Sequence, residues 1–118
     1  MTVNILGTDY EIIVKKYEED KVFEKNSFVG YCSEFEKQIV ICDMKTHPDW
    51  QNDTEKAMQA SQKETLRHEI VHAFFNESGL SYSSNVFNGA WAKNEELVDW
   101  IALQGIKIYK AWLEAGAI

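Results

Sequence analysis

The spacing of hydrophobic positions changes after Met44. Before this point, short runs rich in Ile, Val, Tyr and Phe are separated by polar or glycine-containing segments, a pattern typical of β-strands. It predicts four strands, at about 2–6, 10–14, 28–32 and 38–42. The last two flank the polar segment 33–37 and should form a β-hairpin, whereas the charged segment 15–25 is expected to be a loop or a frayed strand.

The remainder of the chain predicts two helices. Asn52, Asp53 and Thr54 supply capping side chains, and good helix formers without glycine or proline continue as far as Gly79. We therefore expect a helix from about 54 to 78, with a possible break near 60–61, and a loop over 79–89. A second helix is expected from about 92 to 115, with an apolar stripe made of Leu97, Val98, Ile101, Ile108, Tyr109 and Trp112.

Strands followed by helices predict an α+β fold. We expect a small, antiparallel-rich N-terminal sheet of about four strands packed on two long C-terminal helices. The length of 118 residues suits a single domain, 1–118, and the hydrophobic fraction of 45% argues against disorder.

Charge and composition narrow the range of functions. The net charge of −7 and the lack of a basic strip argue against a nucleic-acid partner. No apolar run approaches the roughly 18 residues of a membrane span, and no secretory signal is visible, so a cytoplasmic location is expected. Cys32 and Cys42 are too few for a disulfide framework and are expected to be buried free thiols. If Ser33 pairs with Gln38, the two cysteines face opposite sides of the sheet and cannot bridge.

The most informative segment is His68-Glu69-Ile70-Val71-His72. On a helix, residues four apart lie on one face, so His68 and His72 can bind one zinc ion while Glu69 reaches a water molecule beside it. The same side of the predicted helix carries Asn76, and Leu66, Ile70, Ala73 and Phe74 lie opposite. Val71 and Phe75 flank the histidines, which predicts a helix that is buried on nearly all sides.

A catalytic zinc site needs a third protein ligand and an open position for water. The remaining histidine is His47, in a connector before Pro48. The stronger candidate is Glu95, which shares one margin of the second helix with Asp99, while Glu96 points toward solvent. Asp99 is placed to accept the spare N–H of a ligand histidine and to fix its orientation.

These two segments resemble the gluzincin metallopeptidases, whose third zinc ligand is a glutamate in an Asn-Glu-x-x-x-Asp segment on a following helix. The small size is similar to the minigluzincins and to compact metallopeptidase domains of phages and mobile elements, including the ImmA/IrrE type. The resemblance covers residues 28–112. It implies a zincin-like fold, zinc bound by His68, His72 and Glu95, Glu69 as the general base, and Asp99 as the partner of a ligand histidine.

The resemblance also implies a substrate site. In that family an edge strand before the active-site helix pairs with the substrate backbone, and by position this is 28–32, with Gly30, Tyr31 and Cys32 as substrate-binding residues and Gly30 leaving room. Larger gluzincins stabilise the oxyanion with a histidine or a tyrosine, and Tyr82 is the candidate for this role here.

Three functional hypotheses follow. The leading one is zinc-dependent hydrolysis of peptide bonds in a peptide or protein substrate, in a shallow cleft that a partner protein could complete. The second is a catalytically weak or inactive, zinc-stabilised protein-interaction module, in which His47 or Cys42 would close the site as a fourth ligand. The third is a metal-free domain in which His68 and His72 only bond to Glu95 and Asp99.

Overall fold

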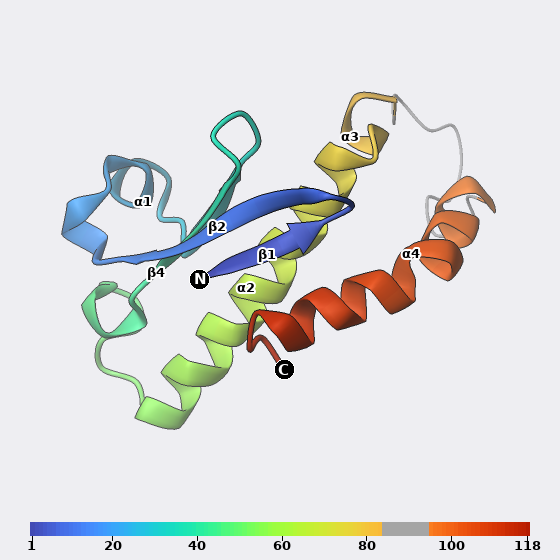
Figure 1. Ribbon diagram of the computed structural model, residues 1–118. Helices are drawn as coiled ribbons and strands as arrows, with labels where there is room; N and C mark the ends of the chain where they lie inside the picture. The colour runs from blue at the N-terminus through green and yellow to red at the C-terminus, as the bar shows by residue number, and fades with distance from the viewer. Residues whose placement is uncertain (84–94) are drawn as a thin grey trace.

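The computed structural model describes residues 1–83 and 95–118, apart from the side chains of Tyr82, Ser83, Glu95, Val98, Asp99 and Ala102. The fold is α+β, with a four-stranded mixed sheet against which helices pack (Figure 1). In chain order the elements are β1 (Thr2–Ile5), β2 (Thr8–Lys15), the 3₁₀ turn η1 (Tyr17–Glu19), α1 (Lys21–Asn26), β3 (Gly30–Ser33), β4 (Gln38–Cys42), the 3₁₀ turn η2 (Met44–Thr46), α2 (Glu55–Glu77), α3 (Leu80–Ser83) and α4 (Glu95–Glu114).

The sheet has the strand order β1-β2-β4-β3. β1 pairs with β2 and β3 pairs with β4 in antiparallel fashion, but the central pair, β2 and β4, is parallel. Two of the three pairings are antiparallel, as expected of an antiparallel-rich sheet, and the parallel pair makes the sheet mixed. A parallel neighbour requires a crossover, and the segment between β2 and β4 supplies it.

Part of this crossover was predicted wrongly. The charged segment 15–25 contains η1 and all but the last residue of α1 instead of a loop or a frayed strand. α1 begins because the Asp20 side chain caps it by accepting a hydrogen bond from the Val22 N–H. Phe23 then anchors the helix against Val40 and Cys42 on one face of the sheet.

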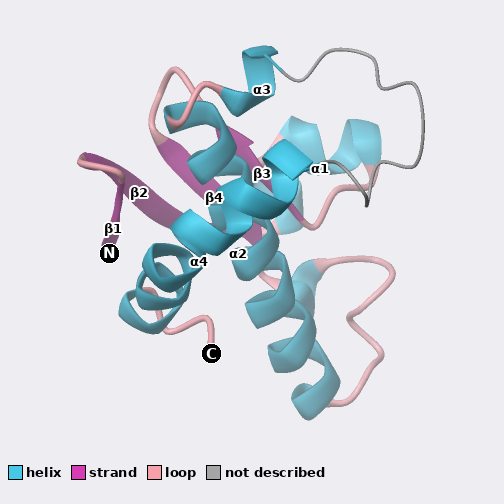
Figure 2. Ribbon diagram, turned by 90° about the vertical axis from the view of Figure 1, so that its right-hand side faces the viewer, coloured by secondary structure: helices cyan, strands magenta, loops and turns pink. Residues whose placement is uncertain are grey.

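The opposite face of the sheet carries the main core. Ile39 and Ile41 of β4 pack there with Ile70 and Phe74 of α2 and with Ile108 of α4. Figure 2 shows α2 and α4 together in front of the strands. Ser33 does pair with Gln38, so the two cysteines face opposite sides of the sheet: Cys32 joins this core, Cys42 lies on the α1 face, and both thiols are free.

α2 runs without a break at 60–61 and is capped by Thr54, whose side chain accepts from the Ala57 N–H. The prediction of a helix buried on nearly all sides was wrong, because His68 and His72 are exposed. β3 is the last strand of the sheet, and the side of α2 that carries the two histidines is not covered by a further strand among the described elements.

The second long helix departs from its predicted stripe. Ile108 is buried, but Ile101 and Tyr109 are about half exposed. Leu103 and Ile106, which the stripe did not include, are 74% and 70% exposed, so α4 also carries apolar side chains on its outer side. The predicted loop after Gly79 begins as the helical turn α3, and residues 84–89 of that loop lie outside the described residues. In the described part of the chain, no helix is both long and apolar enough to cross a membrane.

Candidate functional site

His68 and His72 converge on the exposed side of α2. Their Nε2 atoms are 3.0 Å apart and their rings meet edge to face, with centroids 4.8 Å apart. Two nitrogens that share a tetrahedral zinc ion at about 2.0–2.1 Å are separated by roughly 3.3 Å. The histidine pair therefore fits zinc with only a small adjustment of the rings. Without metal, the same separation suits a hydrogen bond between the two nitrogens.

The electrostatic surroundings favour the neutral form of the second imidazole. Partial desolvation of its ring within the cleft, and then the neighbouring His68, lowers the pKa of His72 below its ordinary value, although the residue as a whole is exposed. Because a histidine binds metal through an unprotonated nitrogen, this environment keeps His72 ready for a cation near neutral pH.

Glu69 lies beside the histidines but is buried. It is 7% exposed, and no described residue donates a hydrogen bond to its carboxylate. Burial raises the pKa of Glu69 to about 7. The thiol of Cys32 lies in the same environment, and burial followed by the charge of Glu69 raises the pKa of Cys32 to about 12. Cys32 is therefore a neutral thiol and not a reactive thiolate.

A cleft of about 740 Å³ lies between β3 and α2. Its walls bring together the residues that the sequence predicted separately as metal-binding, catalytic and substrate-binding: Gly30, Tyr31, Cys32, His68, Glu69 and His72. β3 is the edge strand of the sheet on this side, so its outer backbone edge has no strand partner among the described elements. Such an edge is available to pair with an extended chain.

Close packing of β3 on α2 sets the shape of the cleft. A Cβ atom on Gly30 would lie 2.6 Å from Cγ2 of Thr65, so only glycine permits this approach. Further along the strand, Asn76 Nδ2 donates to Cys32 Sγ at 3.7 Å. β3 therefore runs from the middle of α2 toward its C-terminal end.

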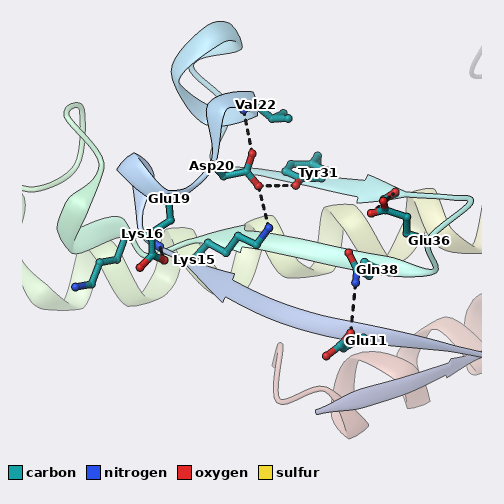
Figure 3. Close-up of polar contacts among 10 residues, drawn as sticks. Glu11, Lys15, Lys16, Glu19, Asp20, Val22, Tyr31, Glu36 and Gln38 are labelled. Carbon is teal, nitrogen blue, oxygen red and sulfur yellow. Dashed lines mark hydrogen bonds and ion pairs between the residues drawn. The ribbon is translucent and has the colours of Figure 1, made fainter.

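Tyr31 contributes to the cleft differently from its two neighbours. Side chains alternate along a strand, and its ring packs against Phe23 on the α1 face. Its hydroxyl donates to Asp20 at 2.6 Å, and Lys15 donates to the same carboxylate at 3.3 Å (Figure 3). The side chain of Tyr31 thus anchors β3 from the α1 face of the sheet, opposite α2.

Three predicted site residues cannot be placed. Tyr82 is in α3, and Glu95 and Asp99 are in the first turns of α4, but their side chains lie outside the described part of the structure. Among the described side chains, no group of three His, Cys, Asp or Glu residues could hold a metal ion. The third ligand remains a prediction.

The two candidates for a fourth protein ligand do not line the cleft. Cys42 is buried on the opposite face of the sheet with Phe23 and Val40. His47 is 2% exposed, its Nδ1 accepts from the Asp49 N–H, and its ring meets Tyr17 edge to face. This arrangement disfavours a zinc site closed by either residue.

Sequence reasoning missed Glu34, Glu64 and Trp50, which also line the cleft. Phe28 lines it too and belongs to the segment 28–32 that was expected to pair with the substrate. Glu64 could have been found, because it precedes His68 by the same four-residue spacing that relates the two histidines. Glu34 follows β3 and Trp50 precedes α2, and only the fold brings them together.

Comparisons of the chain with protein-family models, with curated proteins and with solved structures found no match. The function has to be inferred from the site itself.

Proposed function

We propose that this protein is a zinc-dependent metallopeptidase of the gluzincin type, with a zincin-like fold. One observation carries the proposal. The Nε2 atoms of His68 and His72 lie 3.0 Å apart in a cleft beneath an edge strand, and the buried carboxylate of Glu69 lines the same cleft.

In this proposal His68, His72 and Glu95 hold zinc, and Asp99 orients one of the histidines by accepting its free N–H. Zinc held by these residues would supply a Lewis acid for the scissile carbonyl group and would lower the pKa of water. Glu69 takes a proton from the attacking water and delivers it to the leaving amine. Since no described residue bonds to the Glu69 carboxylate, this side chain is free to do so.

The substrate is an extended segment of a peptide or protein. Its backbone pairs with the free edge of β3 along Gly30, Tyr31 and Cys32, and this pairing fixes the scissile bond above the histidines. Tyr82 is proposed to stabilise the oxyanion. The cleft is open on one side, so a partner protein is proposed to complete it around larger substrates.

Replacement of the general base tests the proposal. Zinc-loaded wild type and Glu69→Gln are compared on a broad peptide library by mass spectrometry. Loss of general-base catalysis should lower the cleavage rate by about 10²–10⁴-fold without loss of zinc. Glu114→Gln is the matched control, since Glu114 is exposed at the end of α4 and does not line the cleft. Zinc-loaded wild type that cleaves no peptide, or a Glu69→Gln variant as active as wild type, would contradict the proposal.

A further inference from the structure

The described wall of the cleft carries carboxylates without opposing lysine or arginine side chains. Glu34, Glu64 and Glu69 all line it, and none of the described residues in its walls is a lysine or an arginine. Lys37, on the β3–β4 hairpin, is paired with Glu77 outside the cleft. The chain as a whole carries a charge of −7, so no distant excess of positive charge offsets this local field.

Glu64 occupies a defined position relative to the histidines. It lies one turn before His68 on α2, so the two share a helix face, with about 6 Å of helix rise between them. The cation best placed on the helix to neutralise Glu64 is Arg67, three residues further on. Arg67 instead donates to the carbonyl of Ala117 at 2.7 Å, and Glu64 has no ion pair with any described residue.

Aromatic side chains accompany this carboxylate. Because Gly30 meets Thr65 and Cys32 meets Asn76, the residues before Gly30 lie toward the N-terminal half of α2, where Glu64 is located. Phe28 lines this end of the cleft and is 45% exposed. Trp50 lines the cleft from the connector that leads into α2.

We propose that the cleft selects peptides with a lysine or arginine side chain on the Glu64 side of the histidine pair. A carboxylate in one cleft with the exposed ring of Phe28 and the partly buried ring of Trp50 suits the two parts of such a side chain. Its apolar stem packs against the rings, and its charged group contacts their faces and bonds to the Glu64 carboxylate. The carboxylate of Glu69, which is buried and has no hydrogen-bond partner among the described residues, lines the same cleft and independently favours a positively charged ligand. Cleavage of these peptides rests on the proposed function, but their selective binding does not.

Binding can therefore be measured without turnover. In a Glu69→Gln background loaded with zinc, calorimetry compares a short capped peptide containing one arginine with the same peptide containing citrulline, which keeps the shape and removes the charge. We expect the arginine peptide to bind about three- to fivefold more tightly at low salt, and the preference to shrink at high salt. Adding Glu64→Gln should remove most of the preference, whereas adding Glu114→Gln, with the same change in charge outside the cleft, should preserve it.

Equal binding of the arginine and citrulline peptides would overturn the proposal, and so would a preference that survives Glu64→Gln. Failure of the wild type to cleave either peptide, with the binding preference intact, would count against the peptidase function alone. The two ideas can thus fail separately.

Discussion

Gly30 is the residue on which the shape of the cleft depends most directly. An added Cβ would lie 2.6 Å from Thr65 Cγ2, 3.1 Å from the carbonyl oxygen of Val40 and 3.2 Å from Ile41 Cδ1. Two of these three neighbours belong to β4, so the methyl group cannot move away from α2 without disturbing the sheet. The close contact of β3 with α2 thus requires the absence of a side chain at this position.

We predict that Gly30→Ala lowers the free energy of unfolding by about 1–3 kcal/mol, the usual cost of overpacking a filled site. Thr65→Ser should recover part of this loss in the double variant, because serine lacks the clashing methyl group and keeps the hydroxyl that donates to the Ser61 carbonyl. Urea unfolding of the four proteins of this cycle provides the measurement. An alanine variant as stable as wild type would show that β3 can move away from α2 at little cost.

At the scale of the elements, Glu77 ties the end of α2 to the sheet. Its carboxylate accepts from Thr8 at 3.0 Å and from Tyr10 at 2.8 Å, both on β2, and it pairs with Lys37 on the β3–β4 hairpin. A carboxylate at the C-terminal end of a helix is disfavoured by the helix dipole, so these three donors have to compensate for it. They hold α2 in the orientation that presents the histidines to β3.

This contact should make the fold sensitive to acid. Burial alone would raise the pKa of Glu77, but the hydrogen bonds from Lys37, Tyr10 and Thr8 outweigh burial and hold it below the ordinary value of 4.5. As the pH falls, Glu77 is therefore protonated at a higher pH in the unfolded chain than in the folded protein. The stabilisation is fully present above pH 4.5 and is lost as the pH falls through the lowered pKa of the folded state.

We predict that Glu77→Gln lowers the free energy of unfolding by about 1–3 kcal/mol at pH 7, because a charged acceptor is lost. The difference from wild type should shrink as the pH falls from 4.5 through the lowered pKa of the folded state, because the wild-type carboxylate then becomes protonated as well. Thermal unfolding between pH 3 and 7 measures both effects. A difference that does not change with pH would mean that the Glu77 carboxylate is not the group responsible.

At the scale of the whole molecule, the sequence predicts the elements better than their arrangement. The four strands and the cap at Thr54 follow from local patterns, and both are observed. The parallel pairing of β2 with β4 does not follow, because an apolar run does not encode its partner or its direction. The sequence also contains a signal for α1, because Asp20 is a good capping residue and precedes the apolar pair Val22-Phe23. The many charged residues in 15–25 obscured this signal.

The sequence likewise predicts the part of the candidate site that lies within one helix better than the part that the fold assembles. The histidine pair with Glu69 is visible in the sequence because a single helix turn defines it. The rest of the cleft wall is less visible, since Phe28 and Glu34, on either side of β3, meet Trp50 and α2 only in the folded chain. Tyr82, Glu95 and Asp99 stay predictions from sequence alone.

The zinc content of the purified protein tests the central claim most directly. After zinc loading and removal of loosely bound metal, elemental analysis should find one zinc ion per chain in wild type and a large loss in His68→Ala and His72→Ala. His47→Gln should retain zinc, because His47 is buried away from the cleft, and circular dichroism would verify that each variant is folded. A folded wild-type protein that retains no zinc, or a His72→Ala variant that retains it as well as wild type, would contradict the account.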